Sequence, residues 1–548
     1  MISKSVWNLP FRATAPALVC WLASCLFASA QSPSSPGQSA ETTSTAETVI
    51  STAPCTDCQA VVDWTKIPPV RPPQRAGNFV IPPTDCGYYS LLDAVQDRFR
   101  DKAPPMPYGI FGFVPTSAFD LDFRFMDQPN FTSQDPWTPL KRIHLGDDWM
   151  IATGGQSWVR TMNEVDSRLT ANDNNYTLFR FRPFVDVWYQ DRIRFFAEFI
   201  YADSFFSDLN PLRIDINRSD LLNLFMDLRL AKFDDGSAYL RIGRQELIYG
   251  SQRLISTLDW ANTRRTFQGI KAFYQGKDWD LDAFWVQPVI PDRNEIDSVD
   301  NNQNFFGLWA TRKIRKGTAI DFYYLGLDNT NPTAIGFHGV RGGQTVHTLG
   351  TRCYGDKEQF LWDTELMVQF GTYSNQDKFA GSAVQGVGYH FKDLPWTPQV
   401  WAYVDWASGE DNPRLDGTNS TFNQLFPFGH YYFGFVDQVA RQNILDLYSQ
   451  VAFYPNHWIT GIIQFHHFTL DSSRDALYNA AGTPIRQDLT GRAGRNVGNE
   501  LDLLLSMQLT DHSNFLVGWS KLFSGSFIEK TGPDVSPELF YVQYSLRW

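Results

Sequence analysis

The region after about Lys141 consists of segments of roughly ten residues in which apolar and polar side chains alternate. In residues 222–230 every even position is apolar, whereas three of the four odd positions are Asn223, Asp227 and Arg229. Successive side chains of a strand point to opposite faces, so this pattern predicts a strand with one apolar and one polar face. The same division recurs in residues 193–201, 238–243 and 501–509.

Strands of a soluble sandwich also alternate, so the pattern alone does not show what the apolar faces contact. Three further features indicate that these faces contact a membrane. The segments are about nine to eleven residues long, enough for a tilted strand to cross a bilayer, whereas soluble strands average about five or six. Tryptophan and tyrosine stand near segment ends, as in interfacial girdles. The last segment places Phe540, Val542, Tyr544, Leu546 and Trp548 on one face.

Residues 141–548 therefore predict an all-β fold, a large antiparallel up-and-down transmembrane β-barrel. At roughly 23 residues per strand and connection, the region allows about 16–18 strands, a size that leaves an aqueous channel. We expect Leu224 and Leu503 to face hydrocarbon. Their neighbours Asn223 and Leu504 would then face the lumen and tolerate a charge better.

Residues 1–30 resemble an export signal. Lys4 and Arg12 precede an uncharged, apolar-rich segment that begins at Ala13 and ends in Ala28-Ser29-Ala30. Cleavage after Ala30 would release the mature chain. Leu22-Ala23-Ser24-Cys25 also resembles a lipobox, so lipidation of Cys25 is the alternative.

Residues 31–86 predict a low-complexity, Ser/Thr/Pro-rich periplasmic tail that is flexible. Residues 87–140 predict a connecting or plug segment with one short helix, because Tyr88, Leu91, Leu92, Val95 and Phe99 share a helical face. That face would either pack against the protein or dock a partner.

Composition excludes two other classes of protein. The 47 Lys and Arg against 59 Asp and Glu give a net charge of −12, which argues against a nucleic-acid-binding protein. The mean hydropathy is −0.30, and no apolar run of about 18 residues follows residue 30, which excludes a polytopic helical membrane protein.

Cys55 and Cys58 have C-x-x-C spacing, but Gln59 follows them where haem attachment needs histidine. A disulfide among Cys55, Cys58 and Cys86 fits an oxidising compartment, and a redox or metal role is the alternative. The sequence predicts no metal site, no cofactor and no catalytic motif.

Several blocks resemble the alginate export family. They are residues 239–254 (YLRIGRQELIYGSQRL), 258–262 (LDWAN), 265–269 (RTFQG), 422–437 (FNQLFPFGHYYFGFVD) and 498–504 (GNELDLL). The resemblance implies an 18-stranded outer-membrane barrel without a cofactor. It also implies an arginine-lined lumen through which an anionic uronate polysaccharide leaves the cell, with acidic residues interleaved.

Alternation assigns a set of charged residues to the lumen. The basic candidates are Arg180, Arg182, Arg192, Arg194, Arg229 and Arg241. Each could instead be a structural charge paired with a carboxylate such as Asp186, Glu198 or Asp227. Arg244 shares the face of Ile242 and must lie at a rim or after a bulge. The acidic gate or spacer candidates are Glu246, Glu500 and Asp502.

The sequence therefore predicts an outer-membrane channel of a Gram-negative-type bacterium that passively conducts an anionic, alginate-like polysaccharide or smaller anions. Its expected partners are outer-membrane lipid, the transported anion and the barrel assembly machinery, which would recognise the strand ending at Trp548. The alternative is a secreted all-β protein that binds or hydrolyses glycans.

Overall fold

The computed structural model describes residues 62–548 except 70–74, 106, 109–115, 133–134 and 414–416. The predicted signal segment, Cys25, Cys55, Cys58 and most of the predicted tail lie outside the described residues. These predictions, and the domain boundaries drawn from them, stay predictions.

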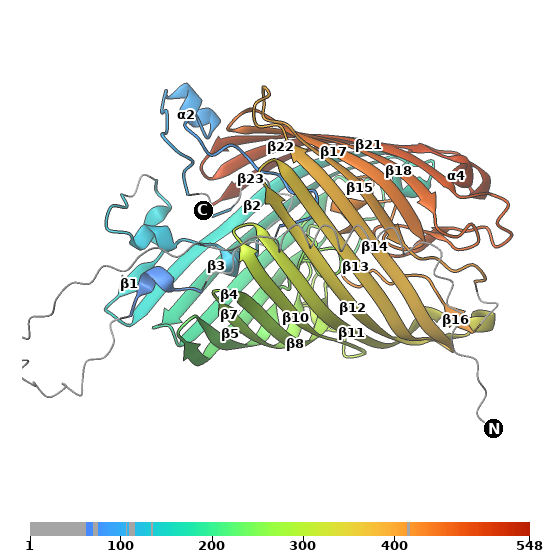
Figure 1. Cartoon of the computed structure of the whole chain (residues 1–548), viewed down its shortest axis with the longest axis horizontal. Coiled ribbons are helices and arrows are strands. Elements are labelled where there is room, and N and C mark those ends of the chain that lie inside the picture. Colours follow the sequence, from blue (N-terminus) through green and yellow to red (C-terminus); the bar gives the residue numbers. More distant parts are fainter. Residues whose placement is uncertain (1–61, 70–74, 106, 109–115, 133–134, 414–416) are drawn as a thin grey trace, which may run out of the picture.

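Eighteen strands form one closed antiparallel barrel, which confirms the predicted fold (Figure 1). Each strand pairs with its predecessor, and β23 pairs with β2 to close the cylinder, with Trp158 opposite Ser545. The strands are β2 (Trp149–Val165), β3 (Asn174–Tyr189), β4 (Ile193–Phe205), β5 (Asn217–Phe233), β6 (Gly236–Gln245), β7 (Phe267–Gly276), β8 (Trp279–Ile290), β10 (Gln303–Arg315), β11 (Thr318–Ile335), β12 (Arg341–Lys357), β13 (Phe360–Tyr373), β14 (Gln376–His390), β15 (Gln399–Ala407), β17 (Ile444–Asn456), β18 (Ile459–Leu470), β21 (Asn496–Thr510), β22 (Ser513–Ser524) and β23 (Glu538–Arg547).

The two ends of the barrel differ. Short turns join the strands at the end where β2 begins and β23 ends, whereas the connections 246–266, 408–443, 471–495 and 525–537 lie at the other. Outer-membrane barrels have short periplasmic turns and longer extracellular loops, which makes the short-turn end periplasmic. In Figure 1, α2 and the C-terminus lie at the periplasmic end, and α4 and β16 lie at the extracellular end.

The remaining elements are short. They are α2 (Leu91–Val95), α3 (Gly429–Tyr432), α4 (Ser526–Thr531), the 3-10 helices η1 (Trp64–Lys66), η2 (Ala118–Asp120), η3 (Arg124–Asp127), η4 (Thr138–Leu140), η5 (Ser167–Leu169) and η6 (Phe337–Gly339), and the strands β1 (Ile143–Leu145), β9 (Ser298–Val299), β16 (Thr418–Asn419), β19 (Leu477–Tyr478) and β20 (Pro484–Arg486). Across the described ranges, every helix is too short or too polar to span a bilayer.

The helix predicted from the apolar face of residues 88–99 covers one turn only. Ser90 caps α2 by accepting a hydrogen bond from the Asp93 backbone N–H at 3.0 Å. The predicted apolar face is solvent-exposed rather than packed, with Val95 75% and Phe99 56% exposed. The expectation of a packing helix is therefore wrong for these two side chains.

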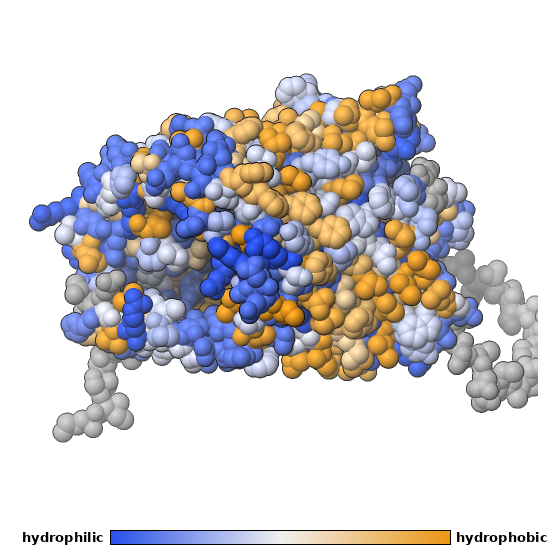
Figure 2. Space-filling view, turned by 180° about the vertical axis from the view of Figure 1, so that it is seen from behind, coloured by the Kyte–Doolittle hydropathy of each residue, from blue (hydrophilic) through white to orange (hydrophobic). Residues whose placement is uncertain are grey.

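The outer face of the barrel is apolar, as alternation predicts. Leu224 and Leu503 are 37% and 39% exposed on this face. Figure 2 shows apolar side chains gathered over the barrel wall, while hydrophilic ones dominate the end at the left of the view. This surface fits the hydrocarbon of a bilayer.

The lumen is filled rather than open, which corrects the expectation that Asn223 and Leu504 border an aqueous channel. Asn223 is fully buried and donates a hydrogen bond to Glu198 at 2.7 Å, and Leu504 belongs to the main apolar core. Connections 246–266 and 408–443 fold inward and contribute to that core, and Ala76, Phe79 and Phe119 of the N-terminal region pack inside the barrel.

Candidate functional site

Period-two alternation places most of the predicted arginines inside the barrel. Arg180 and Arg182 of β3, Arg194 of β4 and Arg241 of β6 are all buried and face the lumen. The alternation of each strand therefore predicts which face these arginines occupy, and the structure identifies the groups that they contact.

Arg192 departs from the prediction, whereas Arg229 lies on the predicted lumen face, opposite the buried Tyr239. Arg192 lies in the turn between β3 and β4 with an exposed side chain, so its assignment to the lumen is wrong. The strand starts one residue later than the alternation suggests. Arg229 of β5 lies beside this turn at the periplasmic end, where its guanidinium pairs with Asp191.

Arg194 and Arg241 belong to a balanced network of ion pairs. Arg194 donates two hydrogen bonds of 2.8 Å to Asp186, and Arg241 donates two, of 2.7 and 2.8 Å, to Asp227. The Arg241 guanidinium also lies 3.7 Å from the centre of the Phe225 ring. Two arginines thus face two carboxylates, which fits the structural alternative for these two residues.

A second group carries more positive than negative charge. We call Arg160, Arg180, Arg182, Arg264 and Arg547 the arginine cluster. It surrounds three carboxylates, those of Glu198, Glu246 and Asp259. Within this group five guanidinium groups face three carboxylates, an excess of two positive charges, and Asp437 also lies near Arg160.

Asp259 connects the cluster to the inward-folded connection 246–266. Its carboxylate pairs with Arg180 of the wall at 2.8 Å and with Arg264 of the same connection. Arg264 also pairs with Glu246, and Arg182 pairs with Glu198 at 3.2 Å. The carboxylate of an extracellular connection therefore occupies a wall arginine.

Arg160 and Arg547 have no carboxylate among the hydrogen-bond partners found in the described residues. Arg160 donates to Gln543 and to the Trp260 carbonyl oxygen, both at 2.8 Å, and its guanidinium lies 3.8 Å from the Trp260 ring centre. Arg547 donates to the Tyr108 carbonyl oxygen at 3.1 Å. Neither arginine forms a direct ion pair with a described carboxylate, although the charges of Asp259 and Asp437 act on Arg160 and that of Asp259 acts on Arg547.

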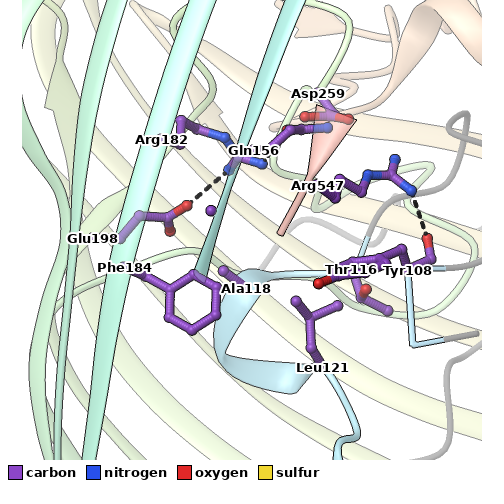
Figure 3. Close-up of a pocket in the computed structure, with 11 residues that line it drawn as sticks. Tyr108, Thr116, Ala118, Leu121, Gln156, Arg182, Phe184, Glu198, Asp259 and Arg547 are labelled. Carbon is purple, nitrogen blue, oxygen red and sulfur yellow. Dashed lines mark hydrogen bonds and ion pairs between the residues drawn. The ribbon is translucent and has the colours of Figure 1, made fainter. Parts of the chain in front are cut away.

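The cluster borders a cavity of about 40 Å³ (Figure 3). Arg182 and Glu198 approach it from the wall, Asp259 from an extracellular connection, and Ala118 and Leu121 from the N-terminal region. A cavity of this size holds a few water molecules at most. The described residues therefore leave little open space beside the cluster.

The predicted gate or spacer residues Glu500 and Asp502 also face the lumen. Glu500 and Asp502 of β21 are fully buried and accept hydrogen bonds from the backbone N–H groups of Val436 at 2.9 Å and Phe435 at 3.4 Å. They fasten connection 408–443 inside the barrel. Arg441 of that connection also donates a 2.8 Å hydrogen bond to Asp405 of β15.

Arg244 lies at the extracellular end of β6, at the rim as expected. It donates to Asp220 at 2.6 Å and to the Asp297 carbonyl oxygen at 2.9 Å. Glu246 follows β6 and is buried against Arg264.

Sequence reasoning missed Arg253, although it lies inside the signature block 239–254. It is buried and pairs with Asp363 at 2.7 Å and Glu365 at 2.9 Å, both on β13. Arg160, Arg264, Arg547 and Asp259 were missed as well. Only the strand residues Arg160 and Arg547 carried a signal, because they alternate with apolar neighbours.

Cys86 is an exposed residue at the periplasmic end, close to the β17–β18 turn. Its predicted disulfide partners lie outside the described residues, so this pairing stays a prediction.

An 18-stranded barrel with an apolar outer belt and a charged lumen defines an outer-membrane channel. A family model described as alginate export matches residues 150–542, and the chain belongs to that family. The protein therefore lies in the outer membrane of a Gram-negative-type bacterium.

Several solved porins are similar in structure. OccD3 (OpdP) of Pseudomonas aeruginosa is 10% identical, with 72% of this chain and 91% of that chain covered and a TM-score of 0.47. OccAB4 of Acinetobacter baumannii is 11% identical, with 72% and 98% covered and a TM-score of 0.47. OccK8 (OprE) of Pseudomonas aeruginosa is 14% identical, with 72% and 98% covered and a TM-score of 0.46. No curated protein matches the chain.

Proposed function

We propose that this channel conducts anions, and that an anionic polysaccharide of the uronate type is its principal substrate. The observation that carries the proposal is the excess of guanidinium groups over carboxylates in the arginine cluster. Conduction of an anion needs fixed positive charges that bind it weakly and at several sites. Arginine stays charged at any physiological pH and binds carboxylates through two parallel hydrogen bonds.

Asp259 suggests how a substrate carboxylate binds. Its carboxylate already lies between Arg180 and Arg264, in the position that a uronate carboxylate would take. When connection 246–266 moves away, Arg180 and Arg182 stay on β3 with Glu198 as the nearby acid. The wall then offers a passing anion two guanidinium groups against one carboxylate.

A sugar polymer is favoured over a small inorganic anion by the aromatic rings beside these charges. Trp158 of β2 lies on the barrel wall, with its ring centre 4.3 Å from the Arg160 guanidinium and 4.7 Å from that of Arg180. The apolar faces of sugar rings stack on such indoles while their carboxylates pair with arginine. The runner-up, a secreted glycan-binding or glycan-hydrolysing protein, is set aside because the chain is an outer-membrane barrel.

The proposal includes the other two expected partners. Outer-membrane lipid surrounds the apolar belt, and the barrel assembly machinery engages β23 through the aromatic side chains that lead to Trp548.

The test is the ion selectivity of the purified protein in planar bilayers under a salt gradient. We expect anion selectivity in the wild type, and we expect Arg180→Gln with Arg182→Gln to lower the ratio of anion to cation permeability severalfold. Arg192→Gln is the matched control, because this arginine is exposed in a turn. The shift should shrink at 1 M salt, where the Debye length is about 3 Å.

A wild-type pore that is cation-selective at low salt would contradict the proposal. So would a selectivity that the Arg180 and Arg182 substitutions leave unchanged in a folded, heat-modifiable barrel.

A further inference from the structure

One segment of the N-terminal region enters the barrel from the periplasmic end and returns to it. We call residues 75–84 the plug loop. At its start Arg75 pairs with Asp356 near the end of β12. Just after it, Asp85 accepts a hydrogen bond of 2.8 Å from His457 in the β17–β18 turn. Both anchors lie at the periplasmic end, so the residues between them form a loop that dips into the lumen.

The lumen wall binds the backbone of this loop at its returning side. The Gln399 side chain accepts from the Ile81 N–H at 2.8 Å and donates to the Ile81 carbonyl oxygen at 2.7 Å. Trp401 of the same strand donates its indole N–H to the Phe79 carbonyl oxygen at 3.0 Å. One glutamine thus satisfies both polar groups of one residue, much as a neighbouring strand would.

Asn78 is bound in the same manner. Gln450 of β17 donates to its carbonyl oxygen at 2.9 Å and accepts from its side-chain amide at 2.6 Å. The Asn78 N–H donates to the hydroxyl of Tyr403 on β15. Asn78 is completely buried, so these hydrogen bonds are shielded from water.

The tip of the plug loop meets the connections that fold in from the extracellular end. The Gly77 N–H donates to the Tyr432 hydroxyl of connection 408–443 at 2.9 Å. From the wall, Arg352 of β12 donates to the Ala76 carbonyl oxygen at 3.1 Å. A Cβ atom on Gly77 would lie 2.3 Å from Nη2 of Arg253 and 2.8 Å from Oδ2 of Asp363. A side chain here would have to displace these two buried groups, and the junction holds the plug loop against connections 246–266 and 408–443 inside the lumen.

We propose that the lumen wall formed by β12, β15 and β17 is a binding site for an extended peptide, that its occupant is this chain's own residues 76–81, and that release of this segment opens the pore. Side chains bind the backbone N–H or carbonyl groups of Ala76, Gly77, Asn78, Phe79 and Ile81, which is the chemistry of peptide recognition. The ion pairs at Arg75 and Asp85 keep the released loop at the periplasmic mouth. The peptide site is supported by the hydrogen bonds described above, whereas the opening of the pore rests on the proposed channel function.

The first test measures single-channel currents of the full chain in planar bilayers. Gly77→Val forces the loop tip away from Arg253, and Asn78→Ala removes a hydrogen bond without adding volume. We expect either variant to raise the open-channel conductance or the open probability severalfold, provided that it keeps a heat-modifiable barrel. Thr84→Val is the matched control, since Thr84 is exposed in the same loop. Conductance equal to that of the wild type in both variants would overturn the proposal.

The second test supplies the occupant as a synthetic peptide with the sequence of residues 75–84. Added to the periplasmic side of the Gly77→Val channel, it should block the current, whereas a scrambled peptide should not. Gln399→Ala with Gln450→Ala in the same background should weaken the block by about tenfold or more, because hydrogen bonds that each contribute about 1 kcal/mol are lost. An open variant that the peptide fails to block would refute the binding site. Neither result depends on ion selectivity, so failure of the plug and failure of the anion channel are separate outcomes.

Discussion

Leu224 shows how the bilayer constrains single residues. It lies in the interior of β5 with its side chain on the outer face. Leu224→Arg should destabilise the folded barrel by about 2–4 kcal/mol, because a guanidinium near the bilayer midplane loses its hydration. The measurement is the fraction of heat-modifiable protein over a urea titration in lipid vesicles.

Phe206→Arg is the control for this prediction, because Phe206 follows β4 in a connection and is 88% exposed. It should fold as the wild type does. Asn223 does not serve as a control that tolerates a charge, since its side-chain amide is buried between Glu198 and the Glu246 backbone. Equal loss of folded barrel from Leu224→Arg and Phe206→Arg would mean that the outer face of β5 does not meet hydrocarbon.

At the scale of residues, the sequence predicts which face of the barrel wall a side chain occupies better than it predicts which groups that side chain contacts. Alternation alone predicts the lumen side of Arg180, Arg182, Arg194 and Arg241, because a strand has a fixed period of two residues. It does not predict which of them is neutralised, since Asp259 and Arg264 reach the cluster from a connection with no periodicity. Arg192 was misplaced because the start of β4 depends on the turn before it.

At the scale of elements, the connection from β8 to β10 contains a carboxyl group that favours its neutral form. Burial raises the pKa of Asp297 to about 7, and the nearby Asp220 adds to the shift, although a hydrogen bond from the Asp292 N–H opposes it. Asp297 also accepts a 2.8 Å hydrogen bond from Asn217 of β5, so its protonation state affects how the connection is held.

The direction of the pH effect follows from this raised pKa. An unperturbed aspartate has a pKa of about 3.9, so the folded state holds the proton more tightly than the unfolded state. The stabilisation is fully present below about pH 4 and is lost as the pH rises through about 7. Hydrogen exchange in residues 291–302, corrected for intrinsic rates, should therefore be slower at pH 5 than at pH 8.

Asp297→Asn removes the titrating group and should abolish this pH dependence. A variant that retains the full difference between pH 5 and pH 8 would show that another group, such as Asp215 with its pKa raised by burial to about 6, controls the connection.

The helix α2 illustrates what an apolar pattern leaves open. The pattern identified a helical face, but it held no information on the surface opposite that face. In the structure α2 is positioned by charge, because Arg100 joins Asp93 at 2.9 Å to Asp511 in the β21–β22 turn at 2.7 Å. Although burial disfavours the Asp93 carboxylate, its hydrogen bonds to Arg100 and Arg98 lower its pKa.

At the scale of the whole molecule, the length of the chain and its alternation predicted a barrel of the right size, because strands of one bilayer's length recur along the sequence. They did not predict a closed lumen. Closure depends on contacts between residues far apart in the chain, such as Gly77 with Tyr432 and Arg253 with Asp363. Alternation reports on a residue's own strand and carries no signal for such contacts.

The seam between β2 and β23 gives the last prediction. Gly155 and Trp548 exchange backbone hydrogen bonds of 2.9 and 3.1 Å, and the Trp548 ring stacks on Phe181 with centres 5.5 Å apart. A Cβ atom on Gly155 would lie 2.5 Å from Cζ2 of this ring. Gly155→Ala and Trp548→Ala should therefore both slow barrel closure severalfold, measured as the appearance of heat-modifiable protein in lipid vesicles without assembly factors.

Ser157→Ala is the matched control on β2, because Ser157 faces outward two residues from Gly155. It should close at the rate of the wild type. Since the vesicles contain no assembly machinery, slow closure of Trp548→Ala there would come from the contacts of this side chain with the barrel and its N-terminal segment. If Trp548→Ala instead closes normally in vesicles but accumulates unfolded in cells, this residue acts through recognition by the assembly machinery and not by stabilising the seam.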